Sequence, residues 1–193
     1  MFPDVACALR HENALQLTAA TILSAQCTDE RVNIVTRDLF ERYETAADYA
    51  AAPQEEMEQV IRSTGFFRNK AKNIRNACEA IIRDHKGKVP RSMAELRELG
   101  GVGRKTANVV LGNMWNTPDG VVVDTHVSRI SQKLGLTGGG SAEKIEKDLN
   151  LIVPREQWTM LPHWLIFHGR RVCKARKPQC EDCVLYEFCY VRA

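Results

Sequence analysis

The chain has 193 residues, enough to bury a hydrophobic core as one large domain or two small ones. Hydrophobic residues make up 44% and charged residues 26%, the composition of an ordinary soluble globular protein. No apolar run approaches the ~20 residues that a membrane span needs, and no targeting signal opens the sequence. We therefore expect no membrane association and a cytoplasmic location, at the nucleoid if the source is prokaryotic.

Apolar residues recur at helical spacing through the first half of the chain. The predicted helices span residues 13–26, 31–43, 45–51, 54–63 and about 66–85. Ser24 to Asp29 is expected to join the first two helices, with Thr28 or Asp29 as the N-cap of the second. At the start of the last of these helices, Phe66 and Phe67 are expected to lie in the core.

A glycine-rich hairpin follows, between a helix that starts at Met93 and one that starts within Arg104–Thr106. Ser92 and Glu95 form a capping box for the first helix, and Gly100 is expected to end it. The second helix presents unpaired backbone N–H groups and its positive dipole end to whatever the hairpin touches. Glycines at 101 and 103 leave room for an anion to approach those amides, so the hairpin suits a phosphate. Alternatively, it is only a short connection between helices.

The second half of the chain is also helical, over 125–134, 141–152 and about 157–172. Asp124 is predicted to be the N-cap of the first of these helices. Gly138 to Gly140 is expected to be a flexible connector. Because nearly every periodic segment has helical spacing, the predicted fold class is all-α.

Four of the seven cysteines lie close together near the C-terminus, at positions 173, 180, 183 and 189. Four thiolates suit either tetrahedral Zn²⁺ or an iron–sulfur cluster. Only Cys180 and Cys183 have the short spacing usual in zinc sites, and the longer gaps fit a larger object. The other cysteines lack partners at ligand spacing.

Basic residues form runs without an intervening acid, at 62–75 and at 170–177. Such runs are usually solvated helix faces. Around a phosphate-type hairpin, however, they suit a DNA backbone. Lys174, Arg176 and Lys177 lie inside the first gap between the clustered cysteines, so this loop is expected to touch phosphates.

The hairpin with Lys105, the Val123-Asp124-Thr125-His126 segment and the cysteine spacing together resemble the helix-hairpin-helix DNA glycosylases, in the bifunctional branch typified by endonuclease III. The resemblance covers essentially the whole chain after Asn13. It implies two helical lobes flanking a DNA-binding cleft, with a [4Fe–4S] cluster as cofactor. A six-helix lobe with the hairpin would span 12–117, and residues 1–11 plus 118–193 would form the cluster lobe.

The resemblance also implies the roles of individual residues. Lys105 would attack the sugar and Asp124 would support the developing positive charge, while Gln26 would fill the space left by a flipped nucleotide. The DNA contacts would come from Gln26, Gly101, Val102, Gly103, Arg104, Lys174, Arg176 and Lys177, and the cluster ligands would be Cys173, Cys180, Cys183 and Cys189.

The implied function is a bifunctional DNA N-glycosylase and abasic-site lyase of base excision repair. It would remove oxidised pyrimidines from duplex DNA through a lysine Schiff base and cut the strand by β-elimination. A monomer is the expected state. Two alternatives stay open: a monofunctional or mismatch-directed glycosylase of the same fold, and a non-catalytic cluster-bearing DNA-binding or redox protein.

Overall fold

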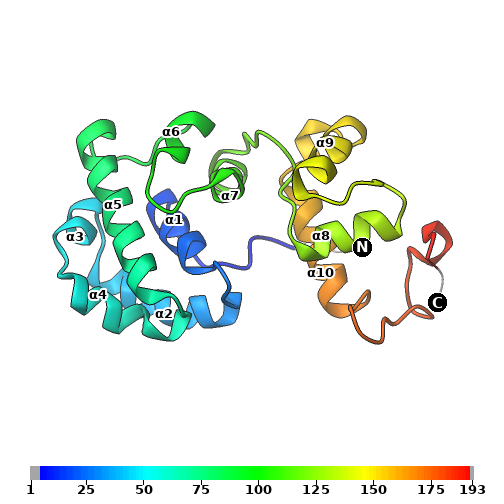
Figure 1. Cartoon of the computed structure of the whole chain (residues 1–193), viewed down its shortest axis with the longest axis horizontal. Helices are drawn as coiled ribbons and strands as arrows, with labels where there is room; N and C mark the ends of the chain where they lie inside the picture. Colours follow the sequence, from blue (N-terminus) through cyan, green and yellow to red (C-terminus); the bar gives the residue numbers. More distant parts are fainter. Residues whose placement is uncertain (1–4, 192–193) are drawn as a thin grey trace. The chain divides into compact units, whose positions relative to one another are not determined.

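Figure 1 shows the computed structural model of the chain, which describes residues 5–191. Within this range the chain forms ten α-helices and three short 3₁₀ helices, with no strand, which confirms the all-α prediction. None of the helices in the described range is long and apolar enough to cross a membrane. The described part of the chain divides into two compact units, an N-terminal unit over Cys7–Trp115 and a C-terminal unit that begins at Asn116 and includes residues 5 and 6.

The N-terminal unit contains seven α-helices: α1 (Ala14–Leu23), α2 (Asp29–Arg42), α3 (Ala46–Ala51), α4 (Gln54–Ile61), α5 (Phe67–His85), α6 (Met93–Arg97) and α7 (Arg104–Trp115). Local capping explains where several of them begin: the side chains of Asn13, Thr28, Thr45 and Ser92 each accept a backbone N–H three residues on.

The core of the N-terminal unit is built around α5, the longest of its helices, which packs against α1, α3 and α4. Fully buried side chains such as Leu17, Tyr49 and Ile81 fill the space between these helices. Helix α1 also packs against α7. The same core therefore positions both α7, which follows the hairpin, and α1, which leads into the turn that carries Gln26.

The C-terminal unit contains α8 (Thr125–Lys133), α9 (Ala142–Ile152) and α10 (Met160–Arg171), which share a smaller core. Helices α8 and α10 approach closely at Gly169, where an added Cβ would lie 2.6 Å from His126 Nδ1. Glycine at this position allows the close approach of the two helices.

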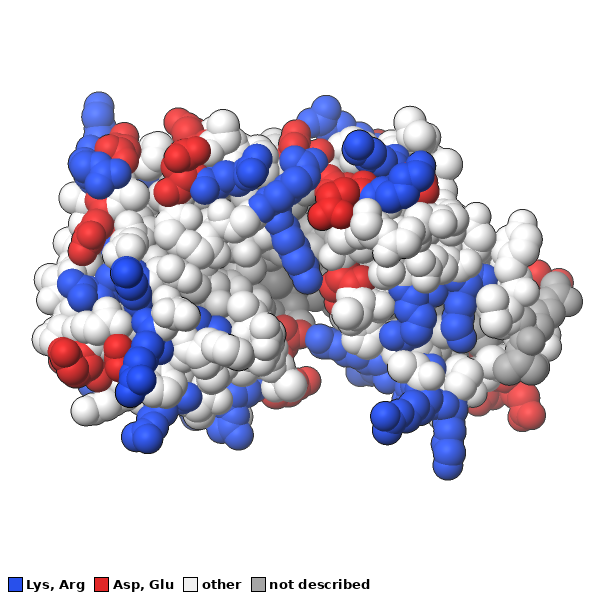
Figure 2. Space-filling model, viewed as in Figure 1, with Lys and Arg blue, Asp and Glu red and all other residues white. Residues whose placement is uncertain are grey.

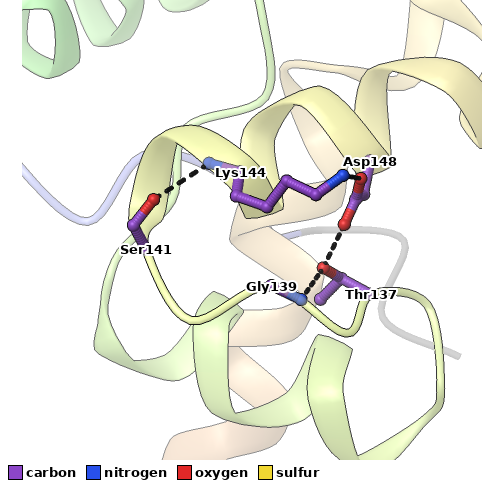
Figure 3. Close-up of polar contacts among 5 residues, drawn as sticks. All are labelled: Thr137, Gly139, Ser141, Lys144 and Asp148. Carbon is purple, nitrogen blue, oxygen red and sulfur yellow. Dashed lines mark hydrogen bonds and ion pairs between the residues drawn. The ribbon is translucent and has the colours of Figure 1, made fainter.

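The connector between α8 and α9 is held by polar contacts, which differs from the predicted flexible linker (Figure 3). Thr137 Oγ1 donates to Asp148 Oδ2 at 2.6 Å and accepts from the backbone N–H of Gly139 at 2.9 Å. Lys144 Nζ pairs with Asp148 Oδ1 at 2.6 Å, and Ser141 caps α9. The glycines therefore lie in a loop whose ends are tied to α9.

Candidate nucleic-acid interface and catalytic residues

The hairpin between α6 and α7 is anchored by two buried apolar side chains, Leu99 and Val102. The backbone N–H of Val102 donates to the carbonyl of Leu99 at 3.1 Å, so this amide is used inside the turn. Gly101 has φ +74°, and a Cβ there would lie 2.9 Å from Asn73 Cβ. Both the backbone conformation and the space at position 101 therefore require glycine.

Beyond this anchor, the hairpin exposes Gly103, Arg104 and Lys105. A Cβ at Gly103 would meet nothing within 4 Å. Helix α7 begins here, since the N–H of Ala107 donates to the carbonyl of Gly103 at 2.9 Å. The amides of the first turn have no acceptor within the helix, and the same turn carries two exposed cationic residues, which is an arrangement suited to an anion.

Asp124 is the N-cap of α8, as predicted, with extended backbone angles. Its Oδ1 accepts hydrogen bonds from the backbone N–H groups of His126 at 2.9 Å and Val127 at 2.8 Å. Both bonds go to one carboxylate oxygen, and the side chain is partly exposed. The second oxygen can therefore face a ligand while the cap is kept.

His126 lies next to Asp124 and is partly buried in the crossing between α8 and α10. Burial lowers the pKa of its imidazole; the Asp124 carboxylate opposes this and the Arg129 guanidinium adds to it. The Arg129 side chain lies 3.4 Å from His126 Nδ1. The neutral imidazole is thus the form that suits this environment.

Gln26 stands at the tip of the turn that follows α1. Its side chain is exposed, and its φ of +53° lies in the left-handed region that non-glycine residues seldom adopt. Hydrogen bonds hold the turn on both sides of Gln26. Before it, the N–H of Ser24 donates to Ala20 O at 2.9 Å, and after it, the N–H of Cys27 donates to Ser24 O at 3.1 Å. An exposed amide side chain held on a strained backbone is a feature typical of ligand-contacting turns.

Phe66 is a second residue of this kind, and the prediction that it lies in the core is wrong. Its side chain is 64% exposed and its φ is +49°, immediately before α5 begins. Phe67 packs against the core as expected. Helical periodicity placed both aromatics at the start of a helix and could not separate the residue inside the helix from the one on the turn. The preceding Gly65, with φ +70°, is the only local signal of that turn.

The four clustered cysteines all line one pocket in the C-terminal unit, together with apolar residues such as Val172 and Val191. None of them forms a disulfide. Arg129 Nη2 donates to the carbonyl of Cys173 at 2.6 Å, which ties the first cysteine to α8. Across the described residues, no three Cys, His, Asp or Glu side chains converge on a point that could hold a single metal ion. Four free thiols around a common, largely apolar pocket fit a polynuclear cluster.

Lys174, Arg176 and Lys177 are exposed on the loop that follows α10, and Lys177 has φ +55°. Figure 2 shows Lys and Arg side chains gathered over the end of α10 and this loop. The exposed Arg170 and Arg171 extend the basic surface into α10 itself. This surface suits a polyanion.

Comparison with known proteins identifies two family matches. Residues 19–155 match the HhH-GPD superfamily base excision DNA repair protein, and residues 173–189 match the iron-sulfur binding domain of endonuclease III.

Curated relatives align over nearly the whole chain. The chain is 51% identical over 189 residues to endonuclease III of Synechocystis sp., covering 98% of this chain and 86% of the relative. It is 48% identical over 190 residues to endonuclease III of Bacillus subtilis, with the same coverage of both chains. A solved structure described as a trapped endonuclease III–DNA covalent intermediate superposes with a TM-score of 0.93 at 50% identity, covering 98% of this chain and 89% of that one.

Proposed function

Since the chain belongs to the endonuclease III family of base excision repair proteins, we propose that it is a bifunctional DNA N-glycosylase and abasic-site lyase. Its substrate is duplex DNA that carries an oxidised pyrimidine or an abasic site. It carries the family's iron–sulfur binding domain, with a [4Fe–4S] cluster as cofactor. We place its action in the cytoplasm, at the nucleoid if the source is prokaryotic, and expect a monomer to suffice.

DNA binding relies on the exposed part of the hairpin and on the basic loop. The amides at the start of α7 and the Arg104 side chain bind a phosphate, while Val102 anchors the hairpin through its buried side chain. Lys174, Arg176 and Lys177 add further phosphate contacts. The nucleotide must leave the helical stack before its glycosidic bond can react, at a cost of a few kcal/mol. Gln26 fills the vacated space with a side chain that can hydrogen-bond to the unpaired base, and the aromatic ring of Phe66 can stack on the remaining bases, so both lower that cost.

Lys105 is the nucleophile in this proposal. Its neutral amine attacks C1′ of the sugar, a C–N bond forms, and the glycosidic bond breaks with its electron pair leaving on the base, which takes up a proton. Ring opening gives a Schiff base, loss of a proton from C2′ expels the 3′ phosphate, and water then releases the lysine. Asp124 carries a negative charge that stabilises the positive charge developing at C1′.

Cys173, Cys180, Cys183 and Cys189 would hold the cluster through their thiolates. When bound, the cluster links four points of the loop that carries the three basic residues. The chain's own contribution is to present these cysteines around one pocket, with the first of them fixed to α8 by Arg129.

The observation that carries the lyase proposal is the exposed Lys105 on the first turn of α7, directly after the glycine hairpin. The test is borohydride trapping on a duplex that contains one abasic site. We expect the wild type and a Lys88→Gln control to form a covalent adduct and Lys105→Gln to form none. Base release by the wild type without trapping would identify a monofunctional glycosylase, and trapping by Lys105→Gln would show that another amine reacts.

A further inference from the structure

Lys70 is the one buried lysine among the described residues, with 4% of its side chain exposed. It lies on the first turn of α5 in the N-terminal unit. Its Nζ donates to two backbone carbonyls, that of Leu23 at 2.8 Å and that of Thr64 at 2.8 Å. The ammonium group therefore joins two segments that are far apart in the sequence.

Each of these carbonyls stands at the start of an exposed turn. Leu23 is the last residue of α1, and the turn that carries Gln26 begins directly after it. Thr64 is the last residue of a 3₁₀ turn, and Phe66 follows two residues later. Gln26 and Phe66 both have left-handed backbone angles and exposed side chains.

The chemistry of the contact explains why a lysine is present at a buried position. The carbonyl of Leu23 belongs to the last turn of α1, where carbonyls have no partner within the helix and the dipole end is negative. A cation with several donors satisfies this carbonyl and that of Thr64 together. Burial lowers the pKa of Lys70, which records the cost of keeping a charge there. An apolar side chain would avoid that cost but would leave both carbonyls unpaired.

We propose that Lys70 is a positioning residue whose ammonium sets the spacing between Gln26 and Phe66, so that both side chains enter the DNA stack together. The inference rests on the proposed function and extends it to a residue that touches no DNA. Because two turns share one anchor, displacement of either carbonyl moves the other side chain as well.

The test compares Lys70→Met with the wild type and with Lys88→Met, which makes the same change at an exposed lysine of the same unit. Two quantities are measured with saturating enzyme on a duplex with one abasic site. One is the single-turnover rate of strand cleavage, and the other is the fluorescence of a 2-aminopurine next to the site, which reports unstacking. We expect Lys70→Met to lower the cleavage rate by about tenfold, which is less than the roughly 100-fold that a 1 Å misplacement can cost, and to reduce the fluorescence change.

A double-mutant cycle separates positioning from a general loss of structure. In a Gln26→Ala/Phe66→Ala background, Lys70→Met should lower the cleavage rate by no more than about twofold, since no side chains remain to be positioned. Saturating enzyme makes the rate a property of the bound complex, so a smaller folded fraction does not imitate the effect. If Lys70→Met does not fold, the same cycle is run with Lys70→Gln, which keeps two N–H donors without the charge.

Equal losses in both backgrounds would overturn the inference, as would a Lys70 variant with full rate and full fluorescence change. Either result would leave the proposed function intact if the wild type still cleaves the abasic duplex. Failure of the wild type to cleave would instead refute the proposed function, and the inference with it.

Discussion

The two roles of Asp124, as helix cap and as catalytic charge, can be separated by replacing it with Asn and with Ala. The cap consists of two hydrogen bonds to one carboxylate oxygen, from the backbone N–H groups of His126 and Val127. Asn offers a carbonyl oxygen at the same place and caps about as well as Asp, whereas Ala offers none.

The structure therefore predicts different stability losses for the two variants. Asp124→Asn loses only the charge near the helix N-terminus, which is worth about 0.3–1 kcal/mol. Asp124→Ala loses the cap as well, which is worth about 0.5–2 kcal/mol. For a protein of this size each kcal/mol lowers Tm by roughly 2–4 °C. Asp124→Ala should thus melt a few degrees below Asp124→Asn.

The rate of base release should depend on the negative charge of Asp124 and not on the hydrogen bonds by which it caps α8. Removal of a group that stabilises developing charge commonly costs about 100- to 1,000-fold in rate. We expect both variants to lose base release by about this factor, although Asp124→Asn stays folded and binds lesion-containing duplex as the wild type does. The measurements are thermal melting, binding and single-turnover base release. Asp124→Asn with near-normal base release would refute the catalytic role and leave Asp124 as a cap only.

Three further predictions concern stability and reactivity. Gly101→Ala should destabilise the fold by more than about 1 kcal/mol because its φ is positive, whereas Gly103→Ala, at a position with open space and no positive φ, should destabilise it less; equal melting of the two variants would contradict this. Burial lowers the pKa of His126 and His163 from 6.5, so the unfolded chain takes up more protons below that pH. Melting temperatures measured from pH 7.5 to 5.5 should therefore fall, and a flat profile would exclude this linkage. Burial also raises the pKa of Cys78 to about 12, so mass spectrometry should find it unalkylated by iodoacetamide in the folded protein at pH 8.

The hairpin and the cap at Asp124 were accessible from the sequence because their determinants are local. Capping depends on a side chain and an amide two or three residues on, as at Asp124 and Ser92. The glycines of the hairpin likewise report a turn that forms within a few residues. The spacing of the four cysteines, all within one loop, likewise indicated a group larger than a single zinc ion.

The burial of individual side chains was harder to predict from the sequence, because it depends on contacts with residues that are distant in the chain. Phe66 was expected in the core, yet it is exposed, and Lys70 occurs within a basic run that suggested a solvated face, yet it is buried. The hydrogen bond from Lys70 to Leu23 spans 47 positions, and no local pattern encodes it. Gly138 to Gly140 were expected to form a flexible connector, whereas the backbone N–H of Gly139 donates to Thr137, which in turn donates to Asp148 on α9.

By itself, the sequence determined the helical class, the hairpin, the cap at Asp124 and the set of cysteines, since each follows from the spacing of residues within one short stretch of chain. The tertiary structure decided which side chains are presented and which are enclosed. It placed Phe66 on the surface and buried the ammonium group of Lys70 against the carbonyls of Leu23 and Thr64, each at the start of an exposed turn. Packing of α5 against α1 brings these segments together, and only that packing makes one buried cation able to serve both.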